Sequence, residues 1–126
     1  AATTGQKVGV VGFCWGGLLA WRAANVLPQV AAAVCYYGGG MTASDERGRS
    51  PGCPVMAHFG RQDPHISVDS VLAFSQAQPQ ARVFLYDADH GFNCDQRASY
   101  DAAAALQARD RSLAFLDACL RPDAAA

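Results

Sequence analysis

A cysteine lies where a predicted strand turns sharply into a predicted helix, an arrangement typical of a catalytic nucleophile. Residues 12–17 read Gly-Phe-Cys-Trp-Gly-Gly and follow the apolar run Val-Gly-Val-Val at 8–11. Such a turn forces its middle residue, Cys14, towards positive φ, and the flanking glycines let strand and helix approach closely. The thiol is then predicted to lie at a helix N-terminus, which favours the nucleophilic thiolate. In isolation the motif fits a small buried core cysteine equally well.

Two polar residues further along the chain complete a predicted catalytic set. Asp63 follows the third predicted strand and His90 follows the fourth. Functional groups in parallel sheets collect beyond the carboxyl ends of the strands, so both residues are expected beside Cys14. A thiol that attacks an acyl carbon needs a base that later protonates the leaving group, and His90 suits both tasks. A carboxylate on the other ring nitrogen fixes the tautomer, and Asp63 is the predicted partner.

Other residues offer alternatives to this set. A lone histidine in a loop is usually exposed to solvent, and an aspartate before proline is a common turn starter. Two further acids are rivals for the histidine partner, but they lie too near His90 in sequence to reach its ring edge-on. These rivals are Asp87 and Asp89. His58 lies within a strand and is predicted to be a core residue, whereas His65 is predicted to be a loop residue with a minor chance of contacting substrate.

Short apolar runs alternate with segments of helical periodicity, which predicts βαβ units and a parallel sheet of about four strands flanked by helices. The expected strands are 7–13, 30–37, 54–59 and 81–86, the first of them buried on both faces. The expected helices are 16–26, one that Ser67 caps and that runs to 77, and one that Ser99 caps and that runs to 120. The predicted apolar face of the last helix is Ala102, Leu106, Leu113, Leu116 and Leu120. Residues 41–53 form a polar loop with room for a short helix.

Size and composition predict one domain, residues 1–126, with a net charge of −1 and charges of both signs scattered along the chain. This pattern predicts no nucleic-acid partner, and no apolar run is long enough to suggest a membrane segment. The cysteines are too widely spaced for a zinc site, so reduced thiols and a cytoplasmic location are expected. They lie at 14, 35, 53, 94 and 119, and Cys35, Cys53 and Cys119 are predicted to fill the core.

The chain resembles the dienelactone hydrolase family of α/β-hydrolases through three motifs, at 12–17, 60–66 and 86–93. The resemblance implies Cys14 as nucleophile, His90 as general base and acid, and Asp63 as its orienting partner. It also implies that the backbone N–H of Trp15 is an oxyanion-hole donor. Members of the family open dienelactones, which are cyclic enol esters, to maleylacetate, and they use no metal or organic cofactor.

Two departures from the family pattern affect these expectations. The family fold is nearly twice as long, so the chain resembles its C-terminal half. The other half would supply a second oxyanion donor, a glutamate near the thiol and an arginine for the substrate carboxylate. Cys94 also stands where dienelactone hydrolases carry a substrate-binding arginine. Further substrate-binding candidates are Tyr37, Phe92 and Arg97.

The sequence therefore predicts a hydrolase of small carboxylic esters or lactones that acts through a Cys-His-Asp triad and a thioester intermediate. A competing hypothesis is a catalytically silent fragment, or a binding domain that associates with itself through an exposed sheet edge. A third hypothesis is a thiol-redox role for Cys14, for which the sequence shows no evident resolving cysteine.

Overall fold

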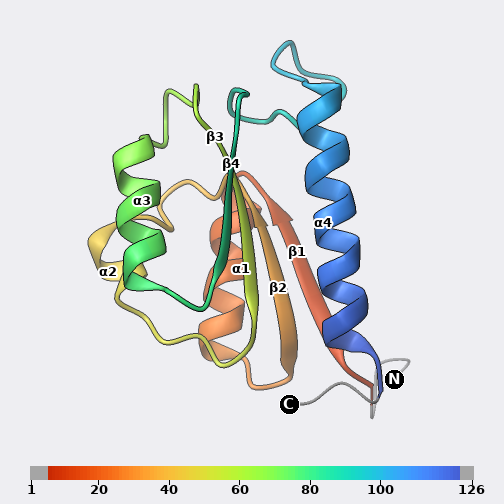
Figure 1. Cartoon of the computed structure of the whole chain (residues 1–126). Coiled ribbons are helices and arrows are strands. Elements are labelled where there is room, and N and C mark those ends of the chain that lie inside the picture. The colour runs from red at the N-terminus through yellow and green to blue at the C-terminus, as the bar shows by residue number, and fades with distance from the viewer. Residues whose placement is uncertain (1–5, 123–126) are drawn as a thin grey trace.

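The computed structural model describes residues 6–122, and these residues form a parallel four-stranded sheet with helices on both faces (Figure 1). The strands are β1 (Val8–Phe13), β2 (Val30–Tyr36), β3 (Val55–Gly60) and β4 (Arg82–Tyr86), in that spatial order. The helices are α1 (Trp15–Val26), α2 (Ser44–Arg47), α3 (Val68–Ala77) and α4 (Ala102–Leu120). The predicted α/β class is confirmed, and the element bounds differ from the expected ones mostly by a residue.

The position of each helix follows from the strand order. Each new strand is added on the same side of the previous one, and right-handed crossovers then place the connecting helices on one face of the sheet. Helices α1, α2 and α3 accordingly lie on one side in Figure 1, while α4 follows the last strand and covers the opposite side. The carboxyl ends of all four strands consequently meet at one edge of the sheet.

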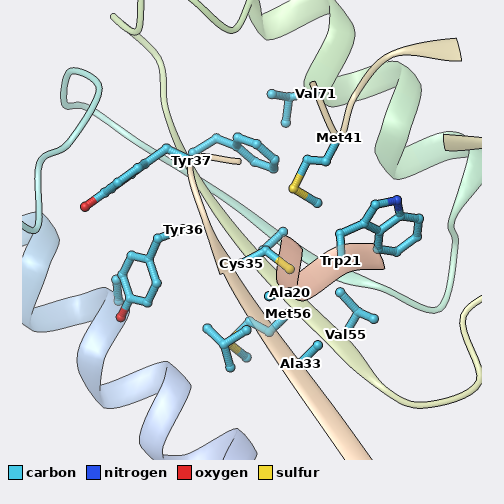
Figure 2. Close-up of a cluster of buried hydrophobic side chains, with 14 of the residues drawn as sticks. Ala20, Trp21, Ala33, Cys35, Tyr36, Tyr37, Met41, Val55, Met56 and Val71 are labelled. Atoms are coloured by element: carbon cyan, nitrogen blue, oxygen red, sulfur yellow. The ribbon is translucent and has the colours of Figure 1, made fainter. Parts of the chain in front are cut away.

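The core between the sheet and α1 is built around aromatic and sulfur-containing side chains. The rings of Trp21 and Phe74 meet edge to face with centroids 5.0 Å apart, and this contact joins α1 to α3. Figure 2 shows Trp21, Met41 and Val71 on one side of β2 and Tyr36 on the side of α4. Burial of these side chains from water supplies the main favourable contribution to folding.

The helix α4 packs on the sheet through small residues, which corrects the predicted apolar face. Leu106 and Leu113 are both 54% exposed, because they lie off the stripe that faces the sheet. Ala102 is exposed as well. Only the end of the predicted face, Leu116 and Leu120, packs against the core. Small side chains let the helix backbone approach the strands, and the buried stripe is Ala104, Ala105, Ala108, Ser112 and Phe115.

One predicted helix cap is confirmed and the other is wrong. The Ser67 hydroxyl accepts a hydrogen bond from the Ser70 backbone N–H, as expected for the cap of α3. The cap of α4 is Asp101 and not Ser99, since the Asp101 carboxylate accepts from the backbone N–H of Ala104 at 2.9 Å. A carboxylate is the stronger acceptor at a helix N-terminus, because its charge adds to the hydrogen bond.

The prediction that the first strand is buried on both faces is wrong, because one of its faces is partly exposed. Val11 and Phe13 point to the α4 side of the sheet and are each 45% exposed. The C-terminal end of α4 covers only the start of the strand, since a Cβ placed on Gly9 would lie 3.1 Å from Leu116. Within the described residues, no strand pairs with the outer side of β1.

Three cysteines expected in the core differ in their burial. Cys35 is fully buried, and burial raises the pKa of its thiol, so the sulfur stays protonated. Cys53 and Cys119 are only partly buried and pack at the margin of the core.

Among residues 6–122, no helix is both long enough and apolar enough to cross a membrane.

Candidate active site

Cys14 occupies a sharp strand-to-helix turn of the kind that the sequence predicts. Its φ is 56°, its backbone N–H donates to the Tyr36 carbonyl at 3.0 Å, and its own carbonyl accepts from the Gly17 N–H at 2.8 Å. A Cβ on Gly12 would lie 1.8 Å from the Gly16 carbonyl oxygen. A Cβ on Gly17 would lie 2.7 Å from that of Tyr36. Only glycines at 12 and 17 therefore let β1, α1 and β2 approach closely enough to form this turn.

The imidazole of His90 is held by the carboxylate of Asp63. His90 Nδ1 lies 2.6 Å from Asp63 Oδ2. The Asp63 side chain is fully buried, and its other oxygen accepts from the His65 backbone N–H at 2.7 Å. The two loops meet because β3 ends in glycine, where a Cβ on Gly60 would lie 2.3 Å from the Ala88 carbonyl oxygen. Because Asp63 occupies Nδ1 and 17% of the His90 side chain is exposed, Nε2 is left for proton transfer.

The rival acids contact other groups. The Asp89 carboxylate accepts from the backbone N–H of His90 at 2.6 Å and does not bond the ring. Asp87 accepts a short hydrogen bond from the Gln62 side chain. His65 is exposed, and its ring meets the His90 ring edge-on with centroids 5.4 Å apart, at the rim of the site.

Tyr37 and Phe92 lie behind His90, where neither faces solvent. Tyr37 is 1% exposed and Phe92 is fully buried, so the expected contact with substrate does not fit their positions. The Tyr37 ring lies 5.1 Å from the rings of both His90 and Phe92. Burial raises the pKa of Tyr37 to about 12, against the effect of a hydrogen bond from the backbone of Asn93. The φ of Tyr37 is 37°, a backbone conformation that is costly for a bulky side chain and is common near functional sites.

The nucleophile candidate has a cationic neighbour. Arg97 Nη2 donates towards Cys14 Sγ at 3.8 Å, and within residues 6–122 this is the only side-chain hydrogen bond to that sulfur. The Trp15 side chain is 70% exposed beside the thiol. Its backbone N–H belongs to the first turn of α1, where helix N–H groups lack an intrahelical partner. The sequence predicts Arg97 near the site as a substrate-binding candidate, but it gives no sign that Arg97 contacts the Cys14 sulfur.

A second histidine lies in a different environment below the site, between the sheet and α4. His58 Nδ1 lies 2.8 Å from the Tyr86 hydroxyl, and its Nε2 lies 2.8 Å from the Ser112 hydroxyl. Arg111 donates to the same Tyr86 hydroxyl at 3.1 Å. Burial, followed by the nearby Arg111 cation, lowers the pKa of His58 to about 3. The prediction of a core histidine is confirmed, although its partners on β4 and α4 had no signal in the sequence.

A parallel sheet with Cys14, Asp63 and His90 placed in that order after β1, β3 and β4 is the arrangement of an α/β-hydrolase fold. Among residues 6–122, no three metal-ligating side chains are grouped as a metal site would require. The family model of the dienelactone hydrolase family matches residues 1–120. The chain therefore belongs to the dienelactone hydrolase family.

Curated relatives agree with this assignment. The carboxymethylenebutenolidase of Pseudomonas putida is 35% identical over 114 residues, which cover 87% of this chain and 48% of that protein. An Escherichia coli K12 protein named "Putative carboxymethylenebutenolidase" is 36% identical over 123 residues, which cover 86% of this chain and 45% of that protein. The chain thus spans about half the length of the curated relatives that it matches.

Solved structures show the same fold. The crystal structure titled "Putative Dienelactone Hydrolase" from Klebsiella pneumoniae superposes with a TM-score of 0.77 at 34% identity. The match covers 86% of this chain and 51% of that one. A dienelactone hydrolase-like promiscuous phosphotriesterase from metagenomic libraries has a TM-score of 0.76 at 22% identity, and this likeness concerns the fold alone.

Proposed function

We propose that the chain carries the catalytic triad of a hydrolase of small carboxylic esters or lactones. The observation that carries the proposal is the 2.6 Å pair between Asp63 and His90 at the sheet edge where the Cys14 turn lies. A buried carboxylate on one ring nitrogen and an accessible second nitrogen suit a general base. Membership of the dienelactone hydrolase family supports the same class of reaction.

In the proposed mechanism the Cys14 thiolate attacks the carbonyl carbon, and the carbonyl electron pair moves to oxygen. The backbone N–H of Trp15 donates to this oxyanion. Collapse of the intermediate breaks the bond to the leaving oxygen, which takes a proton from His90, and leaves a thioester. His90 then removes a proton from water, the hydroxide attacks the thioester, and the acid and the thiolate are released.

The substrate class is narrowed by the nucleophile. A thiolate expels enolates more readily than alkoxides, so activated enol lactones are favoured over amides and simple alkyl esters. The relative from Pseudomonas putida is named for the opening of such a lactone, which supports this choice. Arg97 is the proposed substrate-binding side chain of this chain. A cytoplasmic location belongs to the same proposal and rests on the odd number and wide spacing of the cysteines.

Replacement of the nucleophile tests the proposal. Cys14→Ala in the whole protein is expected to lower hydrolysis of p-nitrophenyl acetate by at least about a thousandfold and to abolish the thioester trapped by rapid acid quench. Cys53→Ala is the matched control, because that thiol is also partly exposed but lies before the amino end of β3, away from the carboxyl ends of the strands. Undiminished activity in Cys14→Ala would rule out the assignment.

A second candidate function is self-association through β1, with or without catalysis. The exposed sides of Val11 and Phe13, on an edge strand without charge or proline, favour pairing with another copy. Sedimentation equilibrium should then show a dimer that Val11→Lys converts to monomer. A monomeric particle that hydrolyses the ester excludes this candidate.

A further inference from the structure

The guanidinium of Arg97 lies against the reacting atom of the proposed nucleophile. Arg97 Nη2 is 3.8 Å from Cys14 Sγ. None of the carboxylates in the described part of the chain lies within ion-pair distance of Arg97. Arg22 and Arg49 differ in this respect, because both pair with the buried carboxylate of Glu46. The positive charge of Arg97 is thus directed at a sulfur and not neutralised by an acid.

The loop after His90 is built so that the Arg97 side chain can reach the sulfur. A Cβ placed on Gly91 would lie 2.8 Å from both Cδ and Nη1 of Arg97. Gly91 also has a φ of 73°, which favours glycine independently of the available space. The Arg97 backbone is fixed by a bond from its N–H to the Cys94 carbonyl at 3.1 Å and by a bond from the Tyr100 N–H at 3.2 Å. The Arg97 backbone is therefore fixed by hydrogen bonds, and its exposed side chain passes close to Gly91 on its way to the sulfur.

We propose that Arg97 is a further catalytic residue that stabilises the Cys14 thiolate in the resting site. An arginine side chain stays protonated at all physiological pH values, so its charge is available before any substrate binds. The charge favours the ionised sulfur, which is the nucleophilic form. This inference rests on the proposed function, because the thiolate is the attacking group there.

The contact between Arg97 and Cys14 stabilises the thiolate both before it attacks the substrate and when it is released from the thioester. When the S–C bond of the thioester forms, the negative charge leaves the sulfur and the guanidinium loses its partner. When hydroxide attacks the thioester, the S–C bond breaks and the electron pair returns to the sulfur as thiolate, beside Arg97. No oxidant or further reactant is needed, since water supplies the hydroxide and His90 carries its proton.

Alkylation by iodoacetamide tests the inference separately from ester hydrolysis. The reagent is neutral, and its reaction reports the thiolate without requiring an oxyanion donor or proton transfer by His90. The modified Cys14 peptide is quantified by mass spectrometry between pH 5 and pH 9, so that the other cysteines do not contribute. The variants are Arg97→Gln and Arg97→Lys, with Arg109→Gln as the control that removes an equal charge from the exposed side of α4.

Loss of the Arg97 charge is expected to slow alkylation of Cys14 about fivefold at pH 7. Arg97→Lys should recover part of the rate, and Arg109→Gln should match the unchanged chain. Identical profiles for Arg97→Gln and Arg109→Gln would overturn the inference. Hydrolysis of p-nitrophenyl acetate is measured on the same samples. A protein that shows the Arg97 effect on alkylation but hydrolyses no ester would refute the proposed function and still support the contact.

Discussion

Two histidines of this molecule, His90 and His58, are both held by hydrogen bonds but differ in their partners and in their exposure to solvent. His90, at the carboxyl end of the sheet, has a carboxylate 2.6 Å from one ring nitrogen and part of its side chain in solvent. His58, between the sheet and α4, has hydroxyl partners on both nitrogens and no exposed surface. The two residues lie on neighbouring strands or on the loops that follow them.

The difference shows what makes a histidine a base. A carboxylate stabilises the imidazolium that forms during proton transfer, and access lets substrate and water reach the second nitrogen. Burial, followed by the nearby cation of Arg111, disfavours the imidazolium and lowers the pKa of His58 to about 3. His58 is therefore a neutral link between β3, β4 and α4, whereas His90 can exchange a proton.

Matched glutamine substitutions give the largest expected contrast. His90→Gln should lower kcat/KM for p-nitrophenyl acetate by about 10³-fold, and it also lowers the free energy of unfolding because the buried Asp63 carboxylate loses its ring partner. His58→Gln should retain hydrolysis and lower the free energy of unfolding in urea by about 2 kcal/mol, because Tyr86 and Ser112 lose well-placed partners. If a folded His58→Gln protein lost as much activity as His90→Gln, the two roles would not be distinct.

The pH dependence of stability gives the next contrast. An unfolded chain protonates His58 near pH 6.5, whereas the folded protein does so near pH 3. The unfolded state thus binds more protons between these values, so stability is fully present above pH 6.5 and falls as the pH is lowered towards 3. Between pH 6.5 and pH 4 this effect amounts to about 3 kcal/mol. Urea unfolding should show a shallower decline over this range in His58→Gln, and parallel curves would contradict the buried neutral state.

The smallest effect is expected at Tyr37, which supports His90 from behind. Tyr37→Phe keeps the ring that packs 5.1 Å from His90 and removes the hydroxyl that accepts from the Asn93 backbone. Loss of this one hydrogen bond, worth about 1 kcal/mol, should lower kcat/KM no more than about fivefold. Steady-state kinetics provide the measurement. A loss equal to that of His90→Gln would mean that the hydroxyl itself takes part in the chemistry.

Local signals in the sequence predicted the parts of the site that depend on the backbone. Glycines at 12 and 17 require a sharp turn, and that turn is present with Cys14 at positive φ. The strand-end positions of Asp63 and His90 led to their predicted pairing, and the structure places the two side chains in contact. These predictions succeeded because parallel strands bring their carboxyl ends to one edge whatever side chains fill the core.

Predictions that depended on which face of a helix or strand packs against its neighbours were less successful. Leu106 and Leu113 fit a helical apolar pattern, but α4 turns its alanine stripe to the sheet and leaves both leucines exposed. The run 8–13 reads as a buried strand, yet it lies at the edge with Val11 half exposed. A periodic pattern indicates that a face is apolar, and the neighbouring elements decide whether that face is buried.

The sequence by itself determined the class of fold, the turn at Cys14 and the positions of Asp63 and His90 after later strands, because each follows from local backbone requirements and strand order. Only the tertiary structure decided which side chains contact one another and how deeply each is buried. Arg97 reaches the thiol across Gly91, Tyr37 packs against the His90 ring, and burial together with the Arg111 cation lowers the pKa of His58. The physical reason is that such contacts join residues far apart in the chain. Their distances and burial, which set charge and reactivity, exist only once the elements have packed.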